Sequence, residues 1–201
     1  KFNFMKKILL FALILFPISV LLSQVNAKRY WIGGSSVNWT DGANWSATDG
    51  GAASSDYPSG TQAEAWLTTA NNQITVNANI TLNRLVVPGV ASVPNGTNYE
   101  ISGDGTSVLT LHSRSAGGNT AQVIGFSKGG AALKFMSTAK VALDTGSPNA
   151  NHVFKFNPTT GTISFLDGSE LDIPTNRNLN MQTTNLGTNF YFKGTIKGNG
   201  D

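Results

Sequence analysis

The segment QVIGFSKGGAALKFMSTAKVALDT, residues 122–145, has the same pattern of apolar and polar positions as the segment thirty residues further along the chain. Residues 152–175, HVFKFNPTTGTISFLDGSELDIPT, align with it without a gap. A fixed period of this length is typical of repeat architectures. The aligned pairs that keep their apolar or polar character are Val123 and Val153, Phe126 and Phe156, Leu133 and Ile163, Phe135 and Phe165, Val141 and Leu171, Leu143 and Ile173, and Thr145 and Thr175.

Each repeat contains three short stretches in which apolar residues alternate with polar ones, and turn-forming runs such as SKGG and LDGS separate them. Alternation with period two predicts a strand with one buried face. No window shows apolar residues at helical spacing over three turns. The sequence therefore predicts an all-β chain after its N-terminal segment, with strands in residues 73–87, 99–102, 107–112, 132–135, 140–144, 162–165, 170–173 and 190–194.

Three strands and three turns per repeat correspond to one coil of a parallel β-helix. Successive coils stack ~4.8 Å apart in such a fold, so each residue lies next to its own repeat partner. We expect a right-handed parallel β-helix over residues 73–201, with Phe126 over Phe156, Phe135 over Phe165, and Leu143 over Ile173. The alternative is an antiparallel sandwich of immunoglobulin type, which has no reason to keep a thirty-residue phase.

The stretch RYWIGGSSVNWTDGANWS, residues 29–46, places three tryptophans and a tyrosine among glycine, asparagine and serine. A solenoid needs an atypical terminal unit, because a bare first coil would expose apolar surface and unpaired strand edges. We expect residues 28–72 to form an N-terminal cap in which Trp31, Trp39 and Trp45 are buried against the strands within 74–87. The alternative is a carbohydrate-binding platform with its rings open to solvent.

The first 27 residues have the pattern of a signal peptide. Lysines at positions 1, 6 and 7 precede an apolar run over residues 8–22, and Val25-Asn26-Ala27 offers small residues at a cleavage site. A membrane-spanning helix normally needs about 20 apolar residues, and this run is shorter. We therefore expect export, cleavage after Ala27, and no stable membrane insertion after cleavage.

The charge of the chain changes when this segment is set aside. The sequence has fourteen basic and eleven acidic residues, but residues 1–27 hold three lysines and no acid, which leaves eleven of each. Nucleic acid binding needs a basic stripe to neutralise phosphates, so that class of partner is not expected. The chain has no cysteine, and burial alone must stabilise it.

Residues that could perform chemistry are few. His112 and His152 are the two histidines, far apart in the sequence, whereas zinc sites need clustered ligands. Asp167, Glu170 and Asp172 alternate in one stretch and offer oxygen atoms for calcium, but a solvated face accounts for them better. We expect no catalytic residue, no metal ligand and no cofactor.

Several motifs of residues 29–112 carry a resemblance to a known class of proteins. They are YWIGG, NWTDGANWS, ATDGGAA, YPSG, ITVNANITLNRLVV and YEISGDGTSVLTL. Together they resemble the N-terminal region of large secreted bacterial surface proteins, in which such a tryptophan-rich opening leads into autotransporter-like β-strand repeats. The resemblance implies an adhesin-like protein on the surface of a Gram-negative-type bacterium. Its expected partners are glycans or surface proteins of a host or environment, and downstream domains of a longer chain, of which this one is a truncated piece.

Two functions of different class remain. One is a non-catalytic surface protein, an adhesin or stalk. The other is part of a polysaccharide-degrading lyase or glycosidase, or a carbohydrate-binding module, since parallel β-helices also carry such enzymes and fold alone does not choose. An enzyme of this class needs paired carboxylates or an acidic groove with a basic residue. This sequence shows no such cluster, and the non-catalytic function is favoured.

Overall fold

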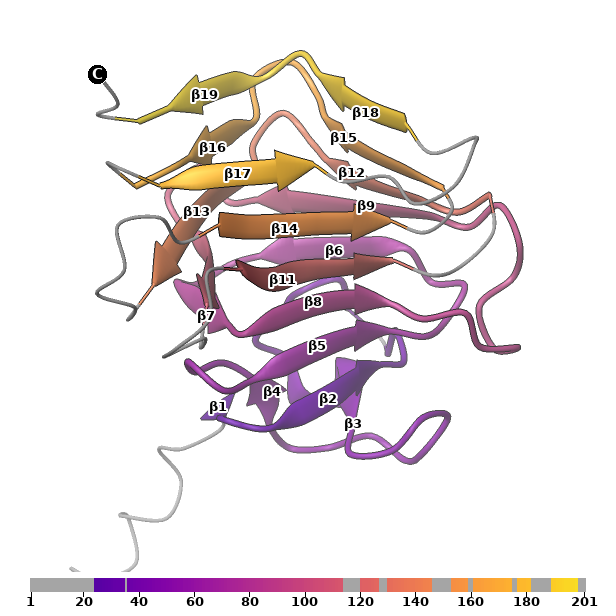
Figure 1. Cartoon of the computed structure of the whole chain (residues 1–201). Coiled ribbons are helices and arrows are strands. Elements are labelled where there is room, and N and C mark those ends of the chain that lie inside the picture. The colour runs from indigo at the N-terminus through magenta and orange to yellow at the C-terminus, as the bar shows by residue number, and fades with distance from the viewer. Residues whose placement is uncertain are drawn as a thin grey trace, which may run out of the picture.

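The computed structural model describes residues 24–34, 36–113, 120–126, 130–145, 153–158, 161–174, 177–181 and 189–198. These residues form three stacked sheets and a short strand pair (Figure 1). The first sheet contains β2 (Lys28–Trp31), β3 (Trp45–Ser46), β5 (Glu64–Leu67), β8 (Arg84–Val87), β11 (Thr120–Phe126), β14 (Val153–Pro158) and β17 (Asn178–Met181). The second contains β6 (Gln73–Val76), β9 (Asn98–Gly103), β12 (Ala132–Phe135), β15 (Thr162–Phe165) and β18 (Asn189–Phe192). The third contains β7 (Ile80–Leu82), β10 (Leu109–Ser113), β13 (Lys140–Thr145), β16 (Glu170–Asp172) and β19 (Thr195–Lys197).

From β5 onward, the chain visits the three sheets in strict rotation. Strands β5, β6 and β7 lie in the first, second and third sheets, and the next three strands repeat that order, as do all later triplets to β19. Within each sheet, a strand pairs in parallel with the strand three positions along the chain, so that the strands lie one above another (Figure 1). The all-β class and the parallel repeat are therefore confirmed, in a solenoid-like arrangement.

The thirty-residue register is confirmed in part of the second and third sheets. Leu133 pairs with Ile163 and Phe135 with Phe165 between β12 and β15. Val141 pairs with Leu171 between β13 and β16, and that pairing extends as far as Ala142 and Asp172. The next expected pair, Leu143 with Ile173, lies just beyond the end of the pairing and is not a strand pair. The last expected pair involves Thr175, which is outside the described residues.

In the first sheet the thirty-residue register is wrong. Phe126 pairs with Pro158, and Phe156 pairs with Ile124 instead of Phe126. Val153 likewise pairs with Thr120 and not with Val123. The register shifts between Gln122 and Ile124, because β11 holds one more residue there than β14 does. From Ile124 onward the register differs from the expected one by two residues. A two-residue slip keeps every side chain on the same face of a strand, so the apolar pattern alone does not distinguish the two registers there.

The core lies between the three sheets and consists of columns of like side chains. In the second sheet, the rings of Phe135 and Phe165 stack with centroids 4.5 Å apart, and those of Phe165 and Phe192 with centroids 4.7 Å apart. Phe156 of the first sheet approaches the same column, with its ring centroid 6.3 Å from that of Phe165. Parallel in-register stacking thus builds the core from repeated contacts, which is what the repeat predicted.

The tryptophans at the N-terminal end are fully buried. Trp31, Trp39 and Trp45 each have 0% exposure, and the Trp45 ring lies 5.0 Å from Trp31 and 4.8 Å from Trp39 between centroids. All three indole N–H groups are satisfied: Trp31 donates to the Asn71 carbonyl at 3.0 Å, Trp39 to the Pro58 carbonyl at 3.0 Å and Trp45 to the Trp39 carbonyl at 2.7 Å. The predicted burial is confirmed, and an open sugar platform made of these three rings is wrong.

The cap forms backbone hydrogen bonds with β5, β6 and β7, one strand in each of the three sheets. In the first sheet, β2 pairs in parallel with β5. In the second, the Thr75 N–H donates to the Val37 carbonyl at 2.7 Å, and the Trp39 N–H donates to the Thr75 carbonyl at 2.8 Å. In the third, the Gly60 N–H donates to the Thr81 carbonyl at 2.7 Å. The cap therefore occupies the position of one further coil and covers strand edges that would otherwise invite association.

Residues just before β2 also bond to the folded chain. Strand β1 (Gln24–Val25) pairs in parallel with β4 (Tyr57–Pro58), which follows the short 3-10 helix η2 (Gly42–Asn44). The Ser59 N–H donates to the Val25 carbonyl at 3.1 Å, and the Gln62 N–H donates to the Asn26 side-chain oxygen at 2.6 Å. The expected signal peptide therefore ends in residues that contact the cap, while residues 1–23 lie outside the described residues.

The opposite end of the stack has exposed apolar residues. Strands β17, β18 and β19 are the last in their sheets (Figure 1). Met181 pairs with the buried Phe156 but is 42% exposed, and Ile196 pairs with the buried Leu171 but is 54% exposed. Within the described part of the chain, no further strand pairs with the outer edges of these three. Among the described residues, the cap thus covers the first strands, whereas Met181 and Ile196 of the last strands are exposed.

Candidate functional site

The fourth tryptophan, Trp66, belongs to the outer surface of the first sheet and not to the cap. In β5, Ala65 and Leu67 are buried, whereas Glu64 and Trp66 are half-buried on the opposite face. The strand register places Trp66 beside Tyr30 of β2, and their ring centroids are 5.9 Å apart with an interplanar angle of 53°. Our sequence interpretation did not single out Trp66, although the alternation in EAWL puts it on the same face as a glutamate.

A lysine ammonium lies over this pair of rings. Lys28 Nζ is 3.4 Å from the centroid of the Trp66 ring and 5.0 Å from that of Tyr30. The Trp66 indole N–H donates to a Glu64 carboxylate oxygen at 2.9 Å. Cation–π attraction of this kind contributes about 0.5–1 kcal/mol at a solvent-accessible site. The contacts hold the two aromatic side chains in fixed positions on the sheet.

Arg84 extends the same surface to the next strand. Its backbone pairs with Glu64 in the register of β5 and β8, and its Nη2 donates to the side-chain oxygen of Gln122 at a long 3.4 Å. A Cβ on Gly125 would lie only 3.1 Å from Arg84 Nη2, so the glycine leaves room for the guanidinium. We refer to Lys28, Tyr30, Glu64, Trp66 and Arg84 as the outer-face strip; all five are half-buried.

The two cations of the strip are not neutralised by salt bridges. Within the described part of the chain, neither Lys28 nor Arg84 lies within 4.0 Å of a carboxylate oxygen, and Arg84 Nε has no hydrogen-bond partner. The neighbouring Arg29 differs, because its Nε and Nη2 donate to the two oxygens of Asp56 at 2.7 and 2.9 Å. That hydrogen bonding holds the pKa of Asp56 below its ordinary value. Other basic residues are also paired: Lys134 with Glu100 at 3.9 Å and Lys197 with Glu170 at 2.8 Å.

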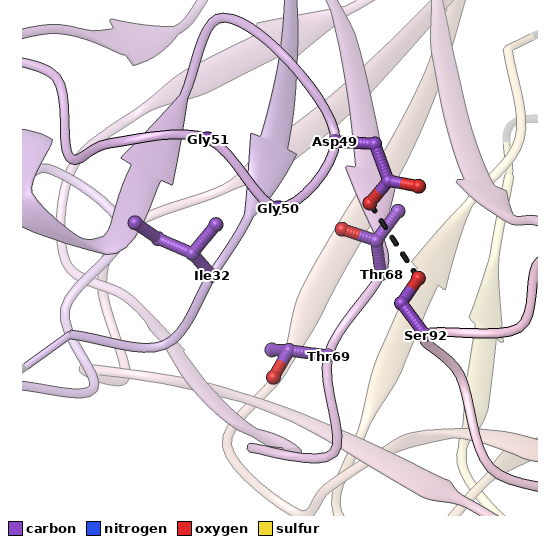
Figure 2. A pocket seen from close by; sticks show the side chains of 7 residues that line it. All are labelled: Ile32, Asp49, Gly50, Gly51, Thr68, Thr69 and Ser92. Atoms are coloured by element: carbon purple, nitrogen blue, oxygen red, sulfur yellow. Dashed lines mark hydrogen bonds between the residues drawn. The ribbon is translucent and has the colours of Figure 1, made fainter.

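A small pocket of about 230 Å³ lies where β2 and β5 end. Figure 2 shows Asp49 and Ser92 facing each other beside it, and the Ser92 hydroxyl donates to the Asp49 carboxylate at 3.5 Å. The lining offers hydroxyls, backbone and one carboxylate, which is too little for acid–base chemistry by paired groups. It consists of Ile32, Asp49, Gly50, Gly51, Thr68, Thr69 and Ser92.

A second, shallow pocket of about 300 Å³ lies on the outer face of the second sheet. The hydroxyls of Thr75 and Ser102 bond to each other at 3.1 Å, and the Ser102 hydroxyl also approaches the Ile74 carbonyl at 3.3 Å. The two hydroxyls therefore satisfy each other across β6 and β9. The lining residues are Val37, Gln73, Thr75, Glu100, Ser102, Met136, Ser137 and Thr138.

Of the two histidines, the structure describes His112. His112 Nδ1 lies 2.9 Å from Asp144 Oδ2 across β10 and β13. The adjacent Ser113 is buried on the opposite side of β10 from His112, so these three residues do not share one face. His152 lies outside the described residues.

The three acidic residues considered for calcium do not converge. Asp167 lies in the turn before β16, where Gly168 has a φ of +85°. Glu170 bonds to Lys197, and this hydrogen bond lowers the pKa of Glu170. Asp172 is exposed and pairs in register with Lys197. Over the described ranges, no three histidine, aspartate or glutamate side chains are close enough together to hold a metal ion.

The described residues contain no helix of the length and apolar character required to cross a membrane. Comparison of the chain with family models, curated proteins and solved structures gives no match.

Proposed function

We propose that this chain is a non-catalytic, exported surface protein, adhesin-like or part of a structural stalk, built as a right-handed parallel β-helix. The rotation of the strands through three sheets supports the helix. Its handedness is supported by a general rule: β5 and β8 are parallel neighbours joined through β6 and β7, and such crossovers are right-handed in about 98% of cases.

The difference between the two ends is the observation that carries this proposal. Three buried tryptophans and a set of edge hydrogen bonds close the N-terminal end, whereas Met181 and Ile196 leave apolar surface open at the other. Strand edges and apolar side chains that are exposed in this way can pair with further strands of the same kind. We propose that downstream residues of a longer chain supply them, on the outer surface of a Gram-negative-type bacterium.

Export is tested by expressing the full chain in a Gram-negative host and fractionating the cells. The wild-type chain should leave the cytoplasm without its apolar run, residues 8–22, and the matched variant Leu13→Arg should remain in the cytoplasm because a charge interrupts that run. Recovery of wild-type protein that retains residues 8–22 would contradict export in soluble form.

The parallel stacking is tested by cysteine pairs, which give a clean result because the chain has no cysteine of its own. Thr110 and Ala142 are register partners on the outer face of β10 and β13. Neighbours in a sheet are ~4.8 Å apart, within the range that a disulfide spans. The pair Thr110→Cys and Ala142→Cys should oxidise readily, and the control pair Thr110→Cys and Asp144→Cys should not. Equal oxidation of both pairs would refute the stacking, and a crystal structure with left-handed coils would refute the handedness.

A further inference from the structure

We propose that the outer-face strip binds a linear acidic polysaccharide, a polymer of sugars that carry carboxylates. This inference rests on the proposed function, since it names the partner that such a surface protein would hold. The juxtaposition that carries it is a pair of half-exposed aromatic rings, Tyr30 and Trp66, with two cations that lack carboxylate partners, Lys28 and Arg84.

The aromatic rings supply the apolar contact surface, although Lys28 covers one face of the Trp66 ring. Tyrosine and tryptophan each present a large apolar body together with a polar group, which suits a partner that is apolar on one face and wet at its edges. The C–H face of a pyranose ring is such a partner. Tyr30 and Trp66 stand on adjacent strands of the first sheet. Their ring centroids are 5.9 Å apart and the ring planes are inclined at 53°, so together they form a bent apolar surface.

The charges select an acidic polymer over a neutral one. The ammonium of Lys28 rests on the Trp66 ring and has no carboxylate partner among the described residues. The carboxylate of Glu64, which accepts from the Trp66 N–H, belongs to the residue between the two cations and offsets one of their two charges. A sugar carboxylate above the rings can therefore pair with Lys28, and charge complementarity of this kind sets specificity.

Arg84 supplies a second cation one strand further along. Its Nη2 donates one long hydrogen bond to Gln122, whereas its Nε is buried without a partner and lies out of reach of a surface ligand. Because Arg84 is only half-buried, a ligand carboxylate at the surface can pair with it, and guanidinium–carboxylate bonds are among the stronger ones in proteins. Lys28 and Arg84 are the strand-register partners of Glu64 on its two sides. A polymer that runs across the strands therefore passes both cations.

The test measures binding of polygalacturonate, with the uncharged polymer hydroxyethylcellulose as comparison, by affinity electrophoresis and calorimetry on the full chain. Trp66→Ala should weaken polygalacturonate binding about tenfold, as loss of an aromatic anchor does. Lys28→Gln and Arg84→Gln should each weaken it several-fold and reduce its dependence on salt. The control variants are Tyr191→Ala and Lys197→Gln, an exposed tyrosine and lysine outside the first sheet, and they should bind as the wild type does. Thermal melts verify that every variant is folded.

The inference is overturned if the wild type does not bind polygalacturonate, if Trp66→Ala binds it as tightly as the wild type, or if the control variants lose as much. Equal binding of the neutral polymer would overturn the acidic specificity. These outcomes are distinct from failure of the proposed function. If the cysteine pairs oxidise in register and export occurs but no polysaccharide binds, the scaffold stands and the ligand inference alone is wrong.

Discussion

Replacing Trp39 by alanine gives the most direct test of the N-terminal cap. The indole is completely buried, its ring contacts Trp45, and its N–H is the donor to the Pro58 carbonyl. The substitution removes the ring from the point where the cap meets the first coil, and it leaves a buried carbonyl without that donor. Trp66→Ala provides the matched control, because it removes the same side chain from the outer face of β5.

The expected cost follows from burial. A tryptophan side chain buries roughly 200 Å², which at ~25 cal/mol per Å² corresponds to about 5 kcal/mol. Measured tryptophan-to-alanine changes in protein cores cost ~3–5 kcal/mol. We therefore expect Trp39→Ala to lower the free energy of unfolding by about 4 kcal/mol. At ~2–4 °C per kcal/mol for a domain of this size, the Tm should fall by about 8–16 °C. Trp66→Ala should cost about 1 kcal/mol, the upper value for a cation–π contact at an accessible site.

Urea unfolding followed by circular dichroism measures both variants against the wild type. Trp39→Phe separates the two contributions, because it keeps most of the apolar area and loses only the indole donor, at a cost of about 1–2 kcal/mol. A loss of under about 1 kcal/mol for Trp39→Ala, or an equal loss for Trp66→Ala, would refute the view that buried indoles close this end of the core.

Three further results are expected. Phe165→Ala removes a buried ring from the stacked column of the second sheet, so it should cost ~3–5 kcal/mol in urea unfolding, whereas Phe165→Leu should cost under about 1.5 kcal/mol; equal losses would show that the ring itself is required and that apolar volume does not replace it. The pKa of Asp56 is lowered by Arg29, so this stabilisation is present above the ordinary pKa of ~3.9 and is lost as the pH falls through the lower folded value; melts from pH 7 to pH 2 should show it, and Asp56→Asn should lack that part of the pH dependence. N-terminal sequencing of the exported protein should begin at Lys28, and a protein that begins further upstream would show that the strand pair of β1 is retained.

The coarse fold was predictable from the sequence because stacked coils impose one simple rule, that like side chains lie on like. The ungapped repeat gave the correct register for Leu133 with Ile163 and for Phe135 with Phe165. It failed in the first sheet because the connection from β11 to β12 is two residues longer than that from β14 to β15. The pairing of β11 with β14 therefore follows a longer offset, as in Thr120 with Val153 and Phe126 with Pro158. Alternation with period two remains satisfied after a two-residue slip, and only the backbone hydrogen bonds distinguish the registers.

The candidate site was less predictable than the fold. The tryptophan-rich stretch drew attention to three rings that turned out to be structural, while Trp66 stands alone in the sequence thirty-six residues after Tyr30. Its proximity to Tyr30 and Lys28 depends on the parallel pairing of β2 with β5. No local pattern contains that pairing, so the strip could be located only once the coils were placed.

The cap at the N-terminal end also gives the stack an order of formation. The cap can act as a folding nucleus. Each later set of three strands then pairs with strand edges that the preceding set has already ordered. The free-energy cost of nucleation then arises once, in the cap. Each later set of strands is stabilised by its contacts with the set before it. Because a chain emerges N-terminus first during synthesis, the cap is available before any of the coils that need it, and folding can follow the order of synthesis.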